Sequence, residues 1–562
     1  MPVPRHRIGQ ASLRISHRHL GSLTPHKRMD QSEVKKLVTH IEENLRASGS
    51  SGLYFVDSRH HRERLLSRQN HVVFGRRGAG KSSLINSITK VDEHVDISLN
   101  LEDFKDITFP NIVIHVLLGT FNQLKEKIKK RTSWYKFWRR KAKKLVDELE
   151  KDCKKLEKYI HEPDEEVREI NAKEAYQGEA SASAKVSALS ATGKEKFDSS
   201  LEIKRTLARS KLEHLKLELT KYKEKISSIS AVLGNKPIFL IMDDLYFVPK
   251  DTQPELVDYF HRLTKGTNLF IKVASIKYRS KIYRRAKDRY IGVELGHDIF
   301  EIDMDYALDN FEELQSFMRQ LLNKAIEQSK ARVEIDLLFA GDGFSQLCLA
   351  SGGVPRDFLS LFVTLANRTS GQPIGKVQVN DVAIANIGSK FDSMKRDSGD
   401  EDAVLQECLN HVKSLIYDEK RTNAFLIAKD DLDKNALGRQ VIRELVDLRL
   451  IHLVDHNTSK APSDGRRYEA YILDVGLYDN SRPRSFTQVE PGQRDAKARK
   501  DDLRASPVIE LQKLLEAGSE HPSGMDNQIQ ESEHKVLPPT KPAATQKISK
   551  KPEQLNLELS FE

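Results

Sequence analysis

One segment near the start of the chain has the residue types and spacing that bind phosphate groups. Residues 71–83 read HVVFGRRGAGKSS and match the pattern G-x-x-x-x-G-K-S. Glycines let such a loop curl so that successive backbone N–H groups point at phosphate oxygens. The lysine then reaches the β- and γ-phosphates, and the serine hydroxyl binds Mg²⁺. We therefore predict a phosphate-binding loop made by Gly75, Arg76, Arg77, Gly78, Ala79, Gly80, Lys81, Ser82 and Ser83.

A second segment supplies the acids that such a loop needs. Residues 237–244 read PIFLIMDD, which is an apolar strand that ends in Asp243 and Asp244. We expect Asp243 to hold the Mg²⁺ through water and Asp244 to activate an attacking water. Many enzymes place Glu at the second position. Aspartate is one methylene shorter, which leaves the reach of Asp244 to that water open.

The elements around the two motifs alternate between strands and helices. Further strands are expected at 94–104, 269–275 and 297–304, and helices at 111–130 and 253–265. This alternation predicts an α/β fold with a parallel sheet and the nucleotide at the carboxyl ends of its strands. At the tip of strand 269–275, Ser275 or Lys277 is placed to sense the γ-phosphate.

A helical region follows the sheet. Residues 305–370 have helical periodicity and contain the segment SGGVPRDFL, in which a Gly-Gly-x-Pro turn precedes Arg356. An arginine at that helix start could reach the phosphates from a helical lid, although it could equally be an ordinary surface residue.

The order of these features resembles the AAA+ ATPases, specifically the branch of replication-origin recognition and archaeal initiator proteins. The NTPase switches of the STAND type share the Asp-Asp ending. The resemblance covers about residues 53–480, apart from an insertion. It implies ATP and Mg²⁺ as ligands, with Lys81 on the phosphates, Ser82 and Asp243 on the metal, Asp244 on the water and Arg356 as a γ-phosphate sensor.

The same resemblance implies an arginine that reaches the ATP of a neighbouring subunit. Three arginines precede the last strand and are candidates for this role: Arg284, Arg285 and Arg289. The substitution of Asp244 for the usual Glu puts the rate of hydrolysis in doubt, but not nucleotide binding.

The insertion at 122–232 has two apolar seams. Leu145, Leu149, Cys153, Leu156 and Ile160 recur on the outgoing arm, and residues 212–229 repeat apolar residues every three or four positions. We predict an antiparallel coiled-coil hairpin. ATPases of the SMC type also carry such an insertion, but they need an S-G-G-Q helix where this chain reads VLGNKP.

The root of the outgoing arm is strongly basic. Residues 127–146 hold ten Lys and Arg and no acid, and they include Trp134 and Trp138. Bases interleaved with aromatic residues suit nucleic acid or an anionic membrane surface. The tryptophans could instead pack on the ATPase body, and all three interpretations stay open.

Residues 401–480 follow the element order of a winged helix. Helix 436–448 would enter a DNA groove, and Lys460, Arg466 and Arg467 on the wing would contact phosphates. Winged helices also dock proteins, so a protein partner is the alternative for this domain.

Composition sets the remaining limits. The 562 residues suggest two to four domains, and their formal net charge of +10 suggests an anionic partner. No apolar run is long enough for a membrane span. Three scattered cysteines exclude a disulfide scaffold or a cysteine zinc site.

We therefore expect an α/β protein of the cytoplasm that binds and hydrolyses ATP, and that couples nucleotide state to self-association and DNA engagement. The alternatives are a STAND-like signalling or defence switch that recruits a protein through the coiled coil, and a nucleotide binder without turnover. The expected divisions are a disordered leader at 1–30 (or a weak transit peptide, or a start at Met29), an ATPase core at 31–121 and 233–304, a coiled-coil insertion at 122–232, a lid at 305–400, a winged helix at 401–480 and a disordered tail at 481–562.

Overall fold

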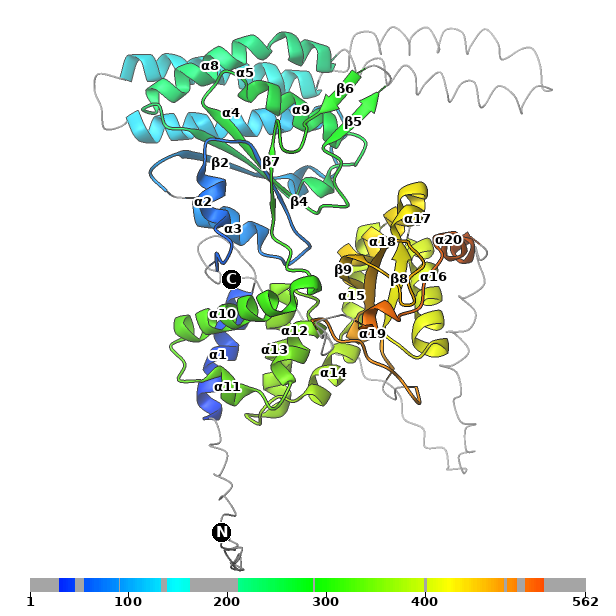
Figure 1. Ribbon diagram of the computed structural model, residues 1–562. Coiled ribbons are helices and arrows are strands. Elements are labelled where there is room, and N and C mark those ends of the chain that lie inside the picture. The colour runs from blue at the N-terminus through cyan, green and yellow to red at the C-terminus, as the bar shows by residue number, and fades with distance from the viewer. Residues whose placement is uncertain are drawn as a thin grey trace, which may run out of the picture.

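The structure is a computed structural model with three parts, an α/β body, a helical lid and a C-terminal domain (Figure 1). No helix among the described residues is long and apolar enough to cross a membrane. The described residues are 30–45, 55–89, 91–132, 139–161, 211–286, 289–398, 402–479, 483–492 and 501–519.

The α/β body is built on a parallel sheet of five strands, as the sequence predicts. The strand order is β2-β3-β4-β1-β7, so β4 lies between the strand before the phosphate-binding loop and the strand that ends in the two aspartates. All carboxyl ends therefore meet at one edge. The strands are β1 (His71–Phe74), β2 (Val95–Asn100), β3 (Ile238–Asp243), β4 (Leu269–Ser275) and β7 (Phe300–Asp303).

Successive residues of each strand point to opposite sides of the sheet, and helices cover both sides. Val72 and Phe74 of β1 face one core, whereas Val73 faces the other. Helix α3 (Lys81–Ile88) and α2 (His61–Leu66) cover the Val73 face. Helices α4 (Asn111–Thr132) and α9 (Gln253–Thr264) cover the opposite face.

The described part of the predicted insertion packs on this body. Helix α5 (Arg139–His161) lies beside α4, and α8 (Leu219–Val232) packs against both α5 and α9. The predicted seam residues Leu149 and Cys153 are buried in the same core cluster as the sheet. The predicted boundary at 122 therefore falls inside the continuous helix α4. Residues 162–210, which include the predicted hairpin tip, lie outside the described residues.

Acids on one helix pair with bases on the other at this contact. Asp152 of α5 pairs with Lys225 of α8 and, at 3.5 Å, with Lys221. Lys155 of α5 pairs with Glu218 at 3.1 Å. These pairs and the apolar seam fix the register of the two helices.

The lid begins earlier in the chain than predicted. Helix α1 (Gln31–Asn44) was expected in the ATPase core, but it packs against lid helices α10 (Phe311–Ser329) and α13 (Pro355–Thr369). Its apolar stripe, which has helical spacing, is buried in the lid cluster rather than against the sheet. The remaining lid helices are α11 (Ile335–Leu338), α12 (Gly343–Ala350), α14 (Lys376–Ala385) and α15 (Ile387–Ser398).

The C-terminal domain has the predicted strands and helices in the predicted order. Its antiparallel sheet has the order β8-β10-β9. The elements are α16 (Asp402–Lys413), β8 (Ala424–Ala428), α17 (Lys429–Lys434), α18 (Ala436–Asp447), β9 (Ile451–Thr458) and β10 (Tyr468–Leu473). Its buried residues form one continuous apolar cluster with those of the lid, whereas the sheet of the α/β body has separate clusters.

Part of the predicted disordered tail is folded. Helices α19 (Asp501–Arg504) and α20 (Leu511–Ser519) pack on the C-terminal domain. In the segment before α20, Pro507 accepts from the Leu426 N–H of β8, and the Ile509 N–H donates to the Leu426 carbonyl. The expectation failed here because Leu511 and Leu514 are buried in an existing apolar surface, so the segment needs no core of its own. Residues 520–562, like the leader at 1–29, lie outside the described residues.

The packing of α20 gives a test of this correction. Leu514 is fully buried, so Leu514→Ala should destabilise the C-terminal domain by about 2–4 kcal/mol. Lys513→Ala, one residue away and exposed, should change stability by less than about 0.5 kcal/mol. Urea unfolding with proteolysis as a readout measures both. Equal stability of the two variants would mean that α20 does not contribute to the fold.

Candidate active site

The phosphate-binding loop runs from the end of β1 into α3. Gly78 and Gly80 have φ values of +90° and +97°, a region that residues with a Cβ rarely adopt. Helix α3 begins directly after Gly80, at Lys81. The loop therefore curls as the motif requires, with the positive end of a helix behind it.

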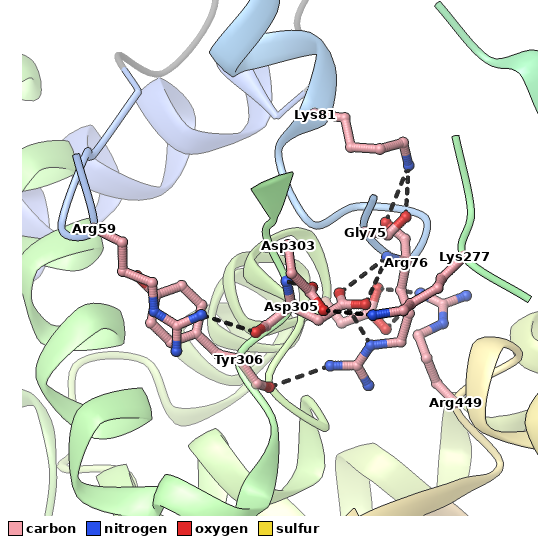
Figure 2. A network of polar contacts seen from close by, with 10 residues as sticks. Arg59, Gly75, Arg76, Lys81, Lys277, Asp303, Asp305, Tyr306 and Arg449 are labelled. Carbon is pink, nitrogen blue, oxygen red and sulfur yellow. Dashed lines mark hydrogen bonds and ion pairs between the residues drawn. The ribbon is translucent and has the colours of Figure 1, made fainter. Parts of the chain in front are cut away.

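The Lys81 ammonium lies folded back on its own loop. It donates to the backbone oxygens of Gly75 at 2.9 Å and Arg76 at 3.3 Å (Figure 2). Burial lowers the pKa of Lys81, and the nearby acids Asp244, Asp305 and Asp243 oppose this effect. The two carbonyl oxygens hold the ammonium where a phosphate oxygen could replace them as its partner.

Ser82 and Asp243 meet although they are far apart in the sequence. The Ser82 hydroxyl donates to Oδ2 of Asp243 at 2.9 Å. Burial raises the pKa of Asp243, and the bonds from Ser82 and from the Asp244 backbone oppose this shift. A hydroxyl and a carboxylate side by side are hard oxygen donors, which fits Mg²⁺ in a site completed by phosphates and water.

Asp244 stands at the entry to this pair in a strained backbone conformation. Its φ is +58°, and its N–H donates to the carboxylate of Asp243 at 2.9 Å. Burial and the charge of Asp243 raise the pKa of Asp244 to about 6. Glu102, just beyond β2, acts in the same direction. An acid with a pKa near neutrality is suited to accept a proton at physiological pH.

A cavity of about 430 Å³ opens in front of the loop. Residues Gly78 to Ser83 contribute its polar wall, together with Arg77, Glu102 and Asp244. Its apolar wall comes from the segment before α2 and from the lid, and consists of Leu45, Phe55, Val56, Phe317, Leu321 and Leu359. Such a cavity can take a ligand with one highly charged part and one flat apolar part.

His61 lines this cavity as well. Its side chain is buried, and within the described part of the chain neither ring nitrogen has a hydrogen-bond partner. Burial lowers its pKa, so the ring is neutral at pH 7. A neutral imidazole with unused nitrogens is a group that a polar ligand edge could satisfy.

The lid closes directly on the phosphate-binding loop. The Arg356 N–H donates to the Gly78 carbonyl at 3.3 Å, and Arg356 lines the cavity. A Cβ added at Gly78 would lie 2.9 Å from the Cβ of Arg356 and 3.0 Å from Val354. The start of α13 thus sits where the Gly-Gly-x-Pro turn was predicted to put it, and its approach depends on the missing side chain of Gly78.

The loop is also tied to the connection between sheet and lid. Asp305, just after β7, accepts from the Arg76 N–H at 2.9 Å and from its guanidinium at 3.3 Å. The same guanidinium donates to the Tyr306 carbonyl at 3.3 Å (Figure 2). Tyr306 stacks on Phe317 of α10, with Arg59 over its other face.

The other predicted site residues lie around this centre. Ser275 is buried at the tip of β4 and bonds Ser280, and Lys277 pairs with Glu301 at 2.6 Å and Asp303 at 3.3 Å. Neither lines the cavity. Strands β5 (Tyr283–Ala286) and β6 (Arg289–Gly292) form a hairpin. On β5, Arg284 pairs with Glu255 of α9, and Arg285 is exposed.

Three residues of the site escaped the sequence analysis. Glu102 and His61 belong to no motif, and only the fold brings them to the cavity. Asp305 lies in the sequence DMDY directly after a predicted strand. Its position at the same sheet edge as Asp243 was the one signal that could have indicated a role.

Comparisons with known proteins find similarity to solved structures, but to no protein family. No protein-family profile and no curated protein matches the chain. Among solved structures, a Walker-type ATPase of Pyrococcus abyssi is similar at 14% identity and a TM-score of 0.33, over 81% of this chain and 97% of that one. The Aeropyrum pernix ORC1 protein in complex with DNA is similar at 10% identity and a TM-score of 0.26, over 80% and 90%.

The contact between loop and lid can be tested with paired glycine variants. Gly78→Ala combines the backbone strain of a left-handed residue with a clash against Arg356, so it should lower nucleotide affinity roughly tenfold or more. Gly266→Ala has the same strain at φ +78° but open space around it, and should cost only about 1 kcal/mol of stability. Titration with a fluorescent nucleotide measures affinity. Unchanged affinity in Gly78→Ala would show that the contact between loop and lid does not contribute to nucleotide binding.

The raised pKa of Asp244 predicts an acid limit to turnover. Asp244 must be ionised to take a proton, so the rate should fall about tenfold per pH unit below about 6. Glu102→Gln removes a charge that raises this pKa and should move the limit to lower pH. The ratio of variant to parent rates across pH cancels the titration of the nucleotide. An unmoved limit would show that Asp244 is not the titrating group.

Proposed function

We propose that the chain binds ATP with Mg²⁺ in the 430 Å³ cavity and hydrolyses it. The observation that carries this proposal is the convergence of Lys81, Ser82, Asp243 and Asp244 at one sheet edge, with Ser82 and Asp243 in direct contact. Each group has the chemistry that its place requires, and the lid contributes Arg356 to the same cavity.

The phosphates would lie against the curled loop. The backbone N–H groups of the loop and of the first residues of α3 would donate to the β-phosphate. The Lys81 ammonium would exchange its two carbonyl partners for phosphate oxygens. Ser82 and Asp243 would hold Mg²⁺, which when bound neutralises charge on the phosphates. The base would lie along the apolar wall, where His61 offers its unused ring nitrogens to the polar edge of the base.

Hydrolysis would use Asp244 as the base. The carboxylate would accept a proton as water attacks the γ-phosphorus, while the bond to the β-γ bridging oxygen breaks and ADP leaves. Arg356 and Lys81 would stabilise the charge that moves to the leaving oxygen. The raised pKa of Asp244 favours proton acceptance near neutral pH.

For the output, we propose that nucleotide state controls assembly and the exposure of a DNA-binding surface. The C-terminal domain has the element order of a winged helix, but its helix α18 faces the α/β body. Arg443 bonds Glu469 at 2.7 Å and lies over the Tyr278 ring, and Glu444 pairs with Lys250 at 3.1 Å. DNA engagement through α18 would therefore require the domain to separate from the body.

A second surface is already accessible. Exposed bases line the junction of α4 and α5, namely Lys129, Lys130, Arg131, Arg140, Lys141, Lys143 and Lys144. The two tryptophans of the basic segment lie outside the described residues. A stripe of this kind suits a phosphate backbone without sequence preference.

The docked state of α18 is also the observation that favours the second candidate, a STAND-like switch that recruits a protein partner. Such a switch needs a closed form in which one domain holds another, and the contacts of Arg443 with the Tyr278 ring and of Glu444 with Lys250 provide that hold. Stimulation of turnover by DNA distinguishes the two functions.

The test is the rate of ATP hydrolysis with and without duplex DNA. Lys81→Ala should abolish ATP binding, and Asp244→Asn should keep binding but slow turnover by roughly 10²–10⁴-fold. Lys35→Ala, at an exposed position on α1, is the matched control and should behave as the parent. Micromolar ATP binding by Lys81→Ala would refute the assignment of the site.

In the same assay, a rise in rate on addition of DNA supports the DNA-coupled function. No response to DNA, with turnover intact, supports the protein-recruiting switch. Intact binding with no turnover in the parent protein would leave a nucleotide binder without catalysis.

A further inference from the structure

A second cavity of about 270 Å³ lies next to the first, and it is lined by parts of the chain that are far apart in sequence. Arg77 of the phosphate-binding loop and Arg356 of the lid line both cavities. Lys390 comes from lid helix α15, and Arg449 from the turn after α18 in the C-terminal domain. All three parts of the molecule therefore meet at this point.

The lining of this cavity is predominantly cationic. Four bases, Arg77, Arg356, Lys390 and Arg449, face two carboxylates. Asp357 binds the Arg449 guanidinium at 2.6 Å, and Asp474 binds Lys390 at 2.7 Å. Basic side chains therefore outnumber acidic ones in this lining by four to two, which favours an anion over a cation.

Arg449 is held in the cavity by a costly backbone conformation. It follows α18 with φ +65°, and the bonds from Arg449 to Val446 and from Leu450 to Leu445 form a Schellman turn. Glycine usually occupies this position because a Cβ there costs about 1 kcal/mol. The turn therefore fixes the direction in which the Arg449 side chain leaves α18.

The guanidinium of Arg449 is only partly satisfied. The residue is 9% exposed, and its Nε is buried with no hydrogen-bond partner among the described residues. Both short bonds to Asp357 use Nη1. Burial of an unpaired N–H of a charged group is expensive, and a bound oxyanion would remove that cost.

We propose that this second cavity is a binding site for a phosphate-type oxyanion, separate from the site of the nucleotide phosphates. The volume and the planar donors of Arg449 fit a tetrahedral group with several acceptor oxygens. The anion would join the phosphate-binding loop, the lid and the C-terminal domain. The source is either free phosphate or the phosphoryl group of a larger molecule. This proposal does not depend on ATP hydrolysis.

The test is calorimetric titration of the full chain in the Lys81→Ala background, which weakens phosphate binding at the loop. Inorganic phosphate and pyrophosphate are the two probes, with sodium chloride at equal ionic strength as the blank. Arg449→Gln should weaken binding at least tenfold. Asp357→Asn, which frees Arg449 from its carboxylate, should tighten binding severalfold.

The two variants break the same ion pair, so loss of stability alone cannot move affinity in opposite directions. Arg439→Gln, exposed on α18, is the control for loss of one positive charge and should bind like the parent. Binding of phosphate with this pattern identifies free phosphate as a sufficient ligand. Binding of pyrophosphate alone with this pattern identifies a phosphoryl group on a larger molecule.

Two results would overturn the proposal. One is the absence of binding by either anion above the salt blank. The other is an affinity that Arg449→Gln and Asp357→Asn leave unchanged, which would assign these residues to domain packing alone.

Discussion

The Asp305 carboxylate supports much of what surrounds the cavity. It accepts from the backbone and the side chain of Arg76, and thereby fixes the first residues of the phosphate-binding loop to the connection that leaves the sheet for the lid. Without this clamp, the loop would still join β1 to α3 and accept from the Arg356 N–H, but its first residues would lose their bonds to the carboxylate that follows β7. The close approach of α13 to Gly78 and the stacking of Tyr306 on Phe317 both require the connection to start from a fixed point.

The charges around Asp305 suit a ligand-binding site as well as a structural connection between sheet and lid. Asp243, Asp244 and Asp305 are close enough to Lys81 to oppose the effect of burial on its pKa. Their mutual repulsion is what a cation or a bound Mg²⁺ would relieve. Arg77 and Arg356 line both this cavity and its neighbour. The site thus places acids that could share a metal ion beside bases that could hold phosphates, which matches a triphosphate with its metal.

Local sequence was enough to predict the centre of the fold. The loop from Gly75 to Ser83 and the pair Asp243 and Asp244 are contiguous motifs between apolar strands, and the parallel sheet follows from them. What could not be predicted depends on tertiary contacts. The apolar stripe of α1 could pack equally well on the sheet or on the lid, and only the structure shows that it packs on the lid. Leu514 lies in a polar tail, but it is buried on a surface that other residues had already formed. Most of the predicted seam residues of α5 and α8 are buried, but periodicity alone could not show that they pack with the helices that cover the sheet.

The placement of α1 has a mechanical consequence. The chain crosses between the lid and the α/β body twice, once between α1 and α2 and once after β7. Two covalent crossings restrict the motion of the lid relative to the body more than a single connection would. The lid and the C-terminal domain share one apolar cluster and would swing together. A small change of angle at Gly78 would then alter the contact between the end of α18 and the α/β body, because Asp447 and Arg449 lie near the loop and the connection after β7.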